Sequence, residues 1–211
     1  MEQALAAADD VYVQYNLGRT FSSHRVYHQV VLNLRGQVAD PTRLVGTHYD
    51  EIRMVPLHLA ANNLLTVFRL YLNRAFLQYL FGQPTGALAS ITLAGQYVQA
   101  AVGMFDTTLL CFYDSLIQLA VATGAAPEAQ TPHLEKVNTN QQRLHRWAQV
   151  APMNFLHKFH LVEAERARVE GYGAEAREHY DTAIALAQQH GYLNDEALAY
   201  ELAGQFYLAR G

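Results

Sequence analysis

Histidines are the residues of this chain whose spacing first suggests chemistry. His24 and His28 stand four residues apart, and His157 and His160 stand three apart, so each pair would share one side of a helix. Two such imidazoles could hold Zn²⁺, but a zinc site needs further protein ligands, and the sequence contains no HExxH or Glu-x-x-His motif. We therefore expect no metal site. We interpret His157, Lys158 and His160 as polar groups near a turn or groove, where helical repeats bind partners.

Two other motifs have simple structural explanations. The stretch Gly171–Ala176 fits the dinucleotide-binding pattern G-x-G-x-x-A, but that pattern needs a strand in front of it, and here a helix precedes it. We expect a turn between two helices. Glu163 with Arg166, and Glu165 with Arg168, stand at i and i+3, so surface ion pairing explains these carboxylates better than acid–base catalysis.

The overall composition excludes several classes of function. The formal charge is −4, and no basic run exists that could follow a phosphate backbone, so we expect no nucleic-acid partner. A single cysteine, Cys111, excludes an internal disulfide framework and favours a reducing, cytoplasmic location. Its neighbours in LLCFY are apolar, which is typical of a buried, unreactive thiol. No motif indicates a cofactor, and a helical hydrolase would need a convergent cluster of carboxylates or histidines that the sequence does not show.

The most apolar window, from Met104 to Thr123, is the only one that suggests a membrane span. Asp106 and Asp114 interrupt it and lie eight residues apart, on nearly one face of a helix. We expect a core helix with a polar edge instead, and hence no membrane partner. The N-terminal stretch shows no basic region before an apolar segment, so it does not resemble a secretory signal.

Apolar periodicity predicts an all-α chain. No segment alternates β-branched and polar residues, and the prolines and most glycines fall between helical segments. The expected N-terminal helices cover residues 3–17, 21–35, 50–61 and 63–81, with a loop at 37–47. Gly18 and Gly36 are expected to end the first two helices in the left-handed conformation. Pro56 is compatible with the third helix only as a kink or a break.

A degenerate repeat follows from Gly82 onward. We expect four glycines to end long helices, namely Gly82, Gly124, Gly171 and Gly211, spaced by 42, 47 and 40 residues. Alanine follows the first three glycines after five residues, at Ala87, Ala129 and Ala176. The spacing exceeds the ~34 residues of a regular tetratricopeptide unit. In the middle unit, Pro127 and Pro132 should delay the second helix to about His133, from where it runs to Ala148.

The last part of the chain has helices with one buried face. Between Gly171 and Gly191, the apolar positions have a helical period and would lie on one side: Ala176, Tyr180, Ala183, Ile184 and Ala187. The helix 195–210 would present an apolar face without a partner helix, formed by Leu198, Leu202, Phe206 and Tyr207. Either the chain is part of a longer protein, or another molecule, such as a second copy in a homodimer, covers that face.

These observations predict one helical-repeat domain over residues 1–211. It would consist of N-terminal helices and a loop at 1–61, followed by degenerate repeats at 62–211, the last of which lacks its second helix. The expected architecture is a tetratricopeptide-like right-handed superhelix of antiparallel hairpins, because a hairpin in such a stack buries its apolar side only against the next one.

Several phrases resemble the helical region of large bacterial multidomain signalling kinases. They are YLFG (79–82), FYDSL (112–116), residues 140–171, YDTAIALAQQHGY (180–192) and DEALAYELAGQFYLARG (195–211), and LNLRG (32–36) and LVGTHYDE (44–51) fit the same region. In that family, a serine/threonine kinase-like domain and an AAA-type ATPase precede the helical region, and a GAF sensor domain and a histidine kinase follow it. The resemblance implies an intracellular tetratricopeptide-like linker between an ATPase and a sensor.

Two functions follow from the sequence. The first is a non-catalytic scaffold within a signal-transduction ATPase or kinase, which links domains and binds a protein or peptide. Its expected binding residues are His157, Lys158, His160, Leu198, Leu202, Phe206 and Tyr207. The alternative is a regulatory domain that senses a small-molecule effector between its helices. We expect no enzymatic activity, because the chain has no Gly-rich kinase loop, no Walker A motif and no phospho-accepting histidine block.

Overall fold

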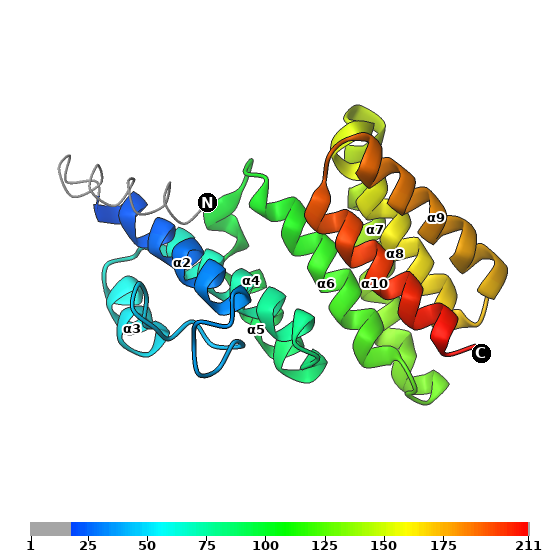
Figure 1. Ribbon diagram of the computed structural model, residues 1–211. Coiled ribbons are helices and arrows are strands. Elements are labelled where there is room, and N and C mark those ends of the chain that lie inside the picture. Colours follow the sequence, from blue (N-terminus) through cyan, green and yellow to red (C-terminus); the bar gives the residue numbers. More distant parts are fainter. Residues whose placement is uncertain (1–17, 211) are drawn as a thin grey trace. The chain divides into compact units, whose positions relative to one another are not determined.

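The computed structural model describes residues 18–210, with side chains from residue 23, and this part of the chain is helical (Figure 1). No strand occurs within it, only an isolated bridge between Val45 and Asp50. The predicted all-α class is therefore confirmed, whereas the helix expected at 3–17 lies outside the described residues. No helix within residues 18–210 is long and apolar enough to cross a membrane.

Contacts divide the chain into two compact units, Met1–Leu110 and Cys111–Gly211, and each is described by itself. The division falls inside helix α6 (Asp106–Ala122). The sequence suggested a single domain with a change of organisation after residue 61.

The first unit is built around α4. Its elements are α2 (Gly18–Leu34), α3 (Glu51–Ala60), α4 (Leu64–Leu80), α5 (Pro84–Gln96) and the short 3₁₀ helix η1 (Val98–Ala101). Helix α4 packs against α2, α3 and α5. One core cluster joins α2, the following loop and α4 through Val26, Val30, Leu44, Tyr49, Leu70 and Leu77. Removal of this apolar surface from water stabilises the unit and fixes the loop 37–50 against α2.

Local sequence signals set the ends of these helices. The Asp50 carboxylate accepts hydrogen bonds from the backbone N–H groups of Ile52 (2.9 Å) and Arg53 (3.4 Å), so α3 begins where the sequence predicts. Helix α3 continues through Pro56 without ending there. Gly36 adopts a φ of 68°, as expected for a left-handed helix end, whereas Gly18 lies inside α2 and ends no described helix.

The second unit contains the end of α6 and four further helices: α7 (Pro127–Val150), α8 (Pro152–Glu170), α9 (Gly173–Gln189) and α10 (Leu193–Leu208). Helix α8 packs against α7 and α9, and α10 packs against α9 and α8 (Figure 1). Gly171 has a φ of 86° and reverses the chain between α8 and α9. The G-x-G-x-x-A stretch is thus a helix–helix turn, as predicted. Gly124 is also left-handed, with a φ of 77°.

The predicted start of the helix after Gly124 is wrong. Helix α7 begins at Pro127 and not near His133, because proline is well suited to the first turn of a helix, where its missing N–H would have no partner anyway. As a consequence Ala129 lies in the exposed first turn of α7 and does not mark a buried repeat position. The other repeat positions, Ala87, Ala176 and Tyr180, are buried as expected.

Candidate functional site

A buried lysine lies at the centre of the second unit. The Lys158 side chain, on α8, is only 2% exposed and donates a hydrogen bond to the carboxylate of Asp195 in the first turn of α10. Its Nζ atom lies 5.4 Å from the ring centroid of Phe112 on α6 and 5.0 Å from that of Tyr192. The aromatic faces and the carboxylate together compensate a charge that would otherwise be costly to bury.

His157 completes this cluster. Its Nε2 atom lies 2.8 Å from Asp195 Oδ2 and 3.0 Å from Lys158 Nζ, and its ring stacks on Tyr192. Burial lowers the pKa of Lys158 and of His157; burial alone would raise the pKa of Asp195, but hydrogen bonds from His157 and the Lys158 charge lower it. We call His157, Lys158 and Asp195 the α8–α10 clamp.

The prediction that His157 and Lys158 lie near a turn or groove where a partner could bind them is wrong. Both side chains are buried, because α10 folds back over α8 and supplies the carboxylate that pairs with them. The clamp therefore positions α10. It lies too deep to contact a partner directly.

His160 points toward a different helix from His157. Its Nδ1 atom lies 2.9 Å from Nδ1 of His179 on α9, and burial together with His179 lowers the pKa of His160 to about 4. The i, i+3 pair His157 and His160 thus does not converge. Within residues 18–210, no group of three or more His, Cys, Asp or Glu side chains is placed to hold a metal ion. The rings of His24 and His28 lie edge to face, 6.5 Å apart.

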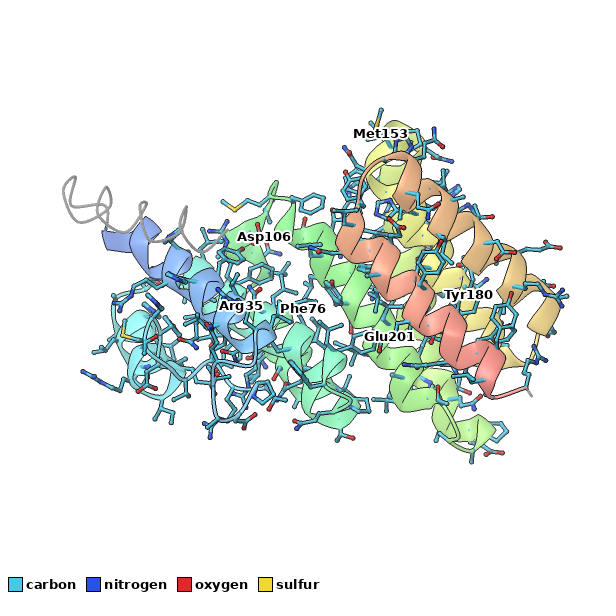
Figure 2. The ribbon with its side chains drawn as sticks, in the orientation of Figure 1. Arg35, Phe76, Asp106, Met153, Tyr180 and Glu201 are labelled. Atoms are coloured by element: carbon cyan, nitrogen blue, oxygen red, sulfur yellow. The ribbon has the colours of Figure 1, made fainter. Side chains whose placement is uncertain are left out.

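The predicted ion pairs exist, but they lie at helix contacts rather than on the surface. Arg168 Nε is 3.1 Å from a Glu165 oxygen, and the buried Glu165 carboxylate also accepts a hydrogen bond from the Tyr180 hydroxyl on α9. Glu163 pairs with Arg166 at 2.5 Å and is buried as well. Tyr180 itself lies between α9 and α10 and contacts Phe206 at a ring-centroid distance of 5.4 Å (Figure 2).

Three of the four apolar side chains expected to lack a cover on α10 are buried. Leu198, Leu202 and Phe206 lie against the preceding helices of the same chain, so the prediction that they face nothing is wrong. Only Tyr207 of this group is exposed, at 46%.

A different face of α10 is uncovered. Leu193 is 74% exposed, Tyr200 51% and Leu208 85%, and Ala197 is exposed between them. Together with Tyr207, these residues follow helical spacing along the side of α10 turned away from the buried leucines. We call Leu193, Ala197, Tyr200, Tyr207 and Leu208 the α10 outer stripe. A contiguous apolar stripe of this kind is typical of an interaction surface.

The 40-residue spacing between Gly171 and Gly211 relates α8 to α10 residue by residue. Lys158 and Glu163 of α8 contact Phe112 of α6 and Gln141 of α7, which precede α8 in the chain. The corresponding residues of α10, Leu198 and Ala203, are also buried against preceding helices. These positions are therefore covered in both helices.

A second set of positions is covered in α8 and mostly exposed in α10. His160 and Glu165 of α8 contact His179 and Tyr180 of α9, and Ala164 and Ala167 are buried beside them. The corresponding positions in α10 carry Tyr200, Gln205, Gly204 and Tyr207. Three of these four residues are exposed, and Gly204 is half-buried. Tyr200 and Tyr207 of the α10 outer stripe therefore occupy positions that are covered in α8.

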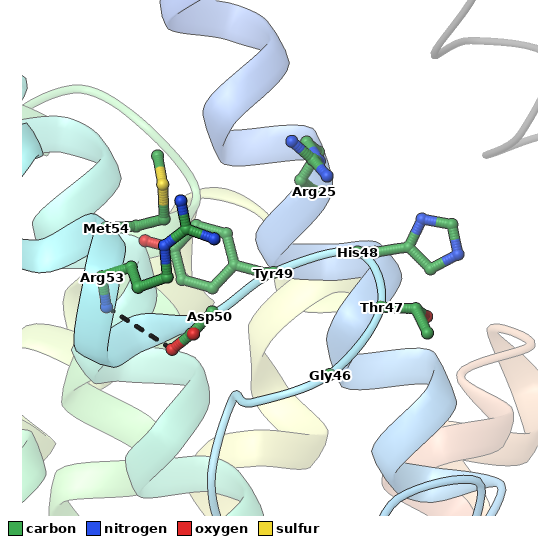
Figure 3. Close-up of a pocket in the computed structure, with 8 residues that line it drawn as sticks. All are labelled: Arg25, Gly46, Thr47, His48, Tyr49, Asp50, Arg53 and Met54. Carbon is green, nitrogen blue, oxygen red and sulfur yellow. Dashed lines mark hydrogen bonds between the residues drawn. The ribbon is translucent and has the colours of Figure 1, made fainter.

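The first unit has a pocket of about 330 Å³, lined by Arg25, Gly46, Thr47, His48, Tyr49, Asp50, Arg53 and Met54 (Figure 3). The Tyr49 ring extends toward Met54, whereas His48 points away from it (Figure 3). The Tyr49 hydroxyl is buried and makes no hydrogen bond with any described residue, and burial raises its pKa. The volume is at the lower end of those of small-molecule sites.

Comparison with known proteins yields no family model, no curated protein and no solved structure that matches this chain. The candidate sites are therefore defined by geometry alone. The sequence does not predict four residues of these sites, namely Asp195, Tyr200 and Leu208 on α10 and Tyr49 in the pocket. For Tyr200 and Leu208 a signal was present, since both belong to a second apolar period on that helix.

Proposed function

We propose that this chain is a non-catalytic helical-repeat module that binds a protein partner within a signal-transduction ATPase or kinase. In this proposal the antiparallel helix pairs belong to a tetratricopeptide-like array, and the partner occupies the α10 outer stripe. The buried Ala167 and the half-buried His160 of α8 correspond to the exposed Tyr207 and Tyr200 of α10. This single observation carries the proposal, because exposed apolar surface on a helix gains stability when another element covers it.

Site-specific photocrosslinking tests this function. A photoreactive amino acid replaces Leu208 in the full chain, expressed in its native cells, and mass spectrometry identifies the captured segments. We expect one defined protein segment to be captured. The matched control places the same photoreactive residue at Gln142, an exposed position on α7. The purified segment should bind the full chain with a measurable Kd, and Leu208→Glu should raise that Kd at least tenfold by placing a charge in an apolar contact.

Two results would contradict the proposal. The first is that position 208 captures nothing beyond what position 142 captures. The second is that the purified segment binds wild type and Leu208→Glu equally. Either outcome shows that the outer stripe is not a docking surface.

A second function has its own supporting observation. The pocket of the first unit contains a buried Tyr49 hydroxyl without a hydrogen-bond partner among the described residues, and such groups in native proteins usually meet water or a ligand. This favours the effector-sensing alternative, with a small polar molecule bound between α2, the loop 46–50 and α3.

Thermal-shift screening with metabolites tests the second function. A ligand that binds only the folded chain raises the melting temperature by mass action. Tyr49→Phe should abolish the shift while leaving the unliganded protein at least as stable, because it removes an unpaired hydroxyl. Tyr97→Phe, a tyrosine of the same unit outside the pocket lining, should preserve the shift. A shift that persists in Tyr49→Phe would exclude this pocket as the binding site.

A further inference from the structure

The α8–α9 hairpin shows what covers this side of a helix in the second unit. Helix α9 brings small side chains to its inner side, where Ala176, Ala183 and Ala187 are buried, with Tyr180 between them. These alanines allow the helix axes to approach closely, while the tyrosine fills the remaining space and reaches Glu165. The turn at Gly171 makes the two helices antiparallel.

Each position of α8 corresponds to the position 40 residues later in α10. The side chains at these positions differ in size, so a helix that covers α10 would meet other side chains than α9 meets on α8. Tyr207 replaces Ala167, so a helix crossing α10 as α9 crosses α8 needs a small residue opposite Tyr207. Gly204 replaces Ala164, and a Cβ atom added at Gly204 would have no heavy atom within 4 Å. Space therefore remains at Gly204 for a larger side chain of the covering helix.

The ion pair that is buried in α8 has no counterpart in α10. Glu165 and Arg168, which surround the Tyr180 hydroxyl, correspond to Gln205 and Leu208 in α10. A covering side chain at the place of Tyr180 would meet an amide and a leucine. It can therefore be aliphatic or aromatic and needs no charge to pair with.

We propose that the occupant of the α10 outer stripe is an amphipathic α-helix of the α9 type, antiparallel to α10, with alanine or glycine opposite Tyr207. The inference rests on the proposed protein-binding function and specifies the partner. The covered hairpin within the same chain supports it, since the surface to be covered continues the α8–α9 and α9–α10 contacts. A second copy of α10 would bring tyrosines and leucines to Tyr207, where a small residue is needed.

The test uses the one α9-type helix whose sequence is known, that of α9 itself. A fluorescently labelled peptide of residues 171–192 is titrated with the full chain, and binding is followed by fluorescence anisotropy. We expect saturable binding that weakens at least tenfold in Gly204→Leu, because the leucine fills the space that the helix needs. Gly204→Leu should fold normally, since the position is open. Gln142→Leu on α7 is the matched control and should bind as wild type does.

A second peptide makes the test specific. Ala183→Glu places a carboxylate in the small-residue stripe, and this peptide should bind at least tenfold more weakly than the native sequence. Equal binding of both peptides, equal binding to Gly204→Leu, or no binding at all would overturn the inference. Sedimentation without peptide adds a further check: a dimer that Gly204→Leu dissociates would make a second copy the occupant and also overturn it. The crosslinking result at position 208 would remain, so failure here is distinguishable from failure of the docking function.

Discussion

Helices α8 and α10 have related positions in the chain but different environments. Both bury one side against helices that precede them, and α8 also buries its other side against α9. In α10 the corresponding side carries Tyr200 and Tyr207, exposed at half their surface or nearly so. In α8 the helix that follows it, α9, completes the burial.

The α8–α10 clamp should have the largest effect on stability. Asp195→Ala removes the carboxylate that pairs with the buried Lys158, and we expect it to lower the free energy of unfolding by about 3–5 kcal/mol. Urea denaturation measures this. The same substitution at the exposed Glu201 should change stability by less than about 0.5 kcal/mol. Lys158→Met, combined with Asp195→Ala, should recover much of the loss, because no unpaired charge then stays buried.

A pair of leucine substitutions tests the comparison directly. Ala164→Leu adds volume where α9 covers α8 and should destabilise the protein by about 1–3 kcal/mol. Gly204→Leu, at the corresponding position of α10, should not destabilise it, because the position is open. Urea unfolding measures both variants. Similar losses of stability in the two would contradict the difference in environment between Ala164 and Gly204.

His160, whose counterpart in α10 is Tyr200, should make the stability of the protein depend on pH. The pKa of His160 is about 4 in the folded chain against 6.5 in the unfolded one, so between these values the unfolded chain binds a proton that the folded chain does not. Stability should therefore fall on acidification from pH 6.5 to 4. His160→Gln should reduce this fall, by on the order of 1 kcal/mol given the partial exposure of the ring. Chemical denaturation at several pH values measures it, and an unchanged slope in the variant would refute the assignment.

The smallest expected effect concerns Gly204 alone. Gly204→Ala should raise the free energy of unfolding by about 0.5–1 kcal/mol, because alanine restricts the unfolded chain and a methyl group there meets no atom. Ala164→Gly should lower it by at least as much, since a buried methyl contact with α9 is also lost. Thermal unfolding should show higher stability for Gly204→Ala and lower stability for Ala164→Gly, which would support the difference between the two helices.

The sequence predicted what depends on local chemistry. The sequence predicts the start of α3 at its Asp50 cap, the helix ends at Gly36 and Gly171, and the burial of Ala176 and Tyr180. These features follow from capping, backbone preference and helical period, which act over a few residues. The start of α7 is not predicted correctly, because proline breaks the interior of a helix but suits its first turn, where Pro127 lies.

The candidate site depended on tertiary packing and was predicted less well. Helix α10 has apolar residues on two sides, so its period alone does not decide whether Leu198 or Tyr200 is buried. Contacts of α10 with α8 and α9 determine which side is buried, and these contacts depend on the tertiary packing. Likewise, His157 and Lys158 look like surface groups until Asp195, 37 residues after Lys158, is placed beside them.

The clamp also gives the protein an internal reporter of local opening. The chain has two lysines, Lys136 with half of its side chain exposed and Lys158 almost inaccessible. An acylating reagent should modify Lys136 at once and Lys158 only when α10 detaches from α8, which makes the ratio of the two labelling rates a measure of how often that helix lifts away.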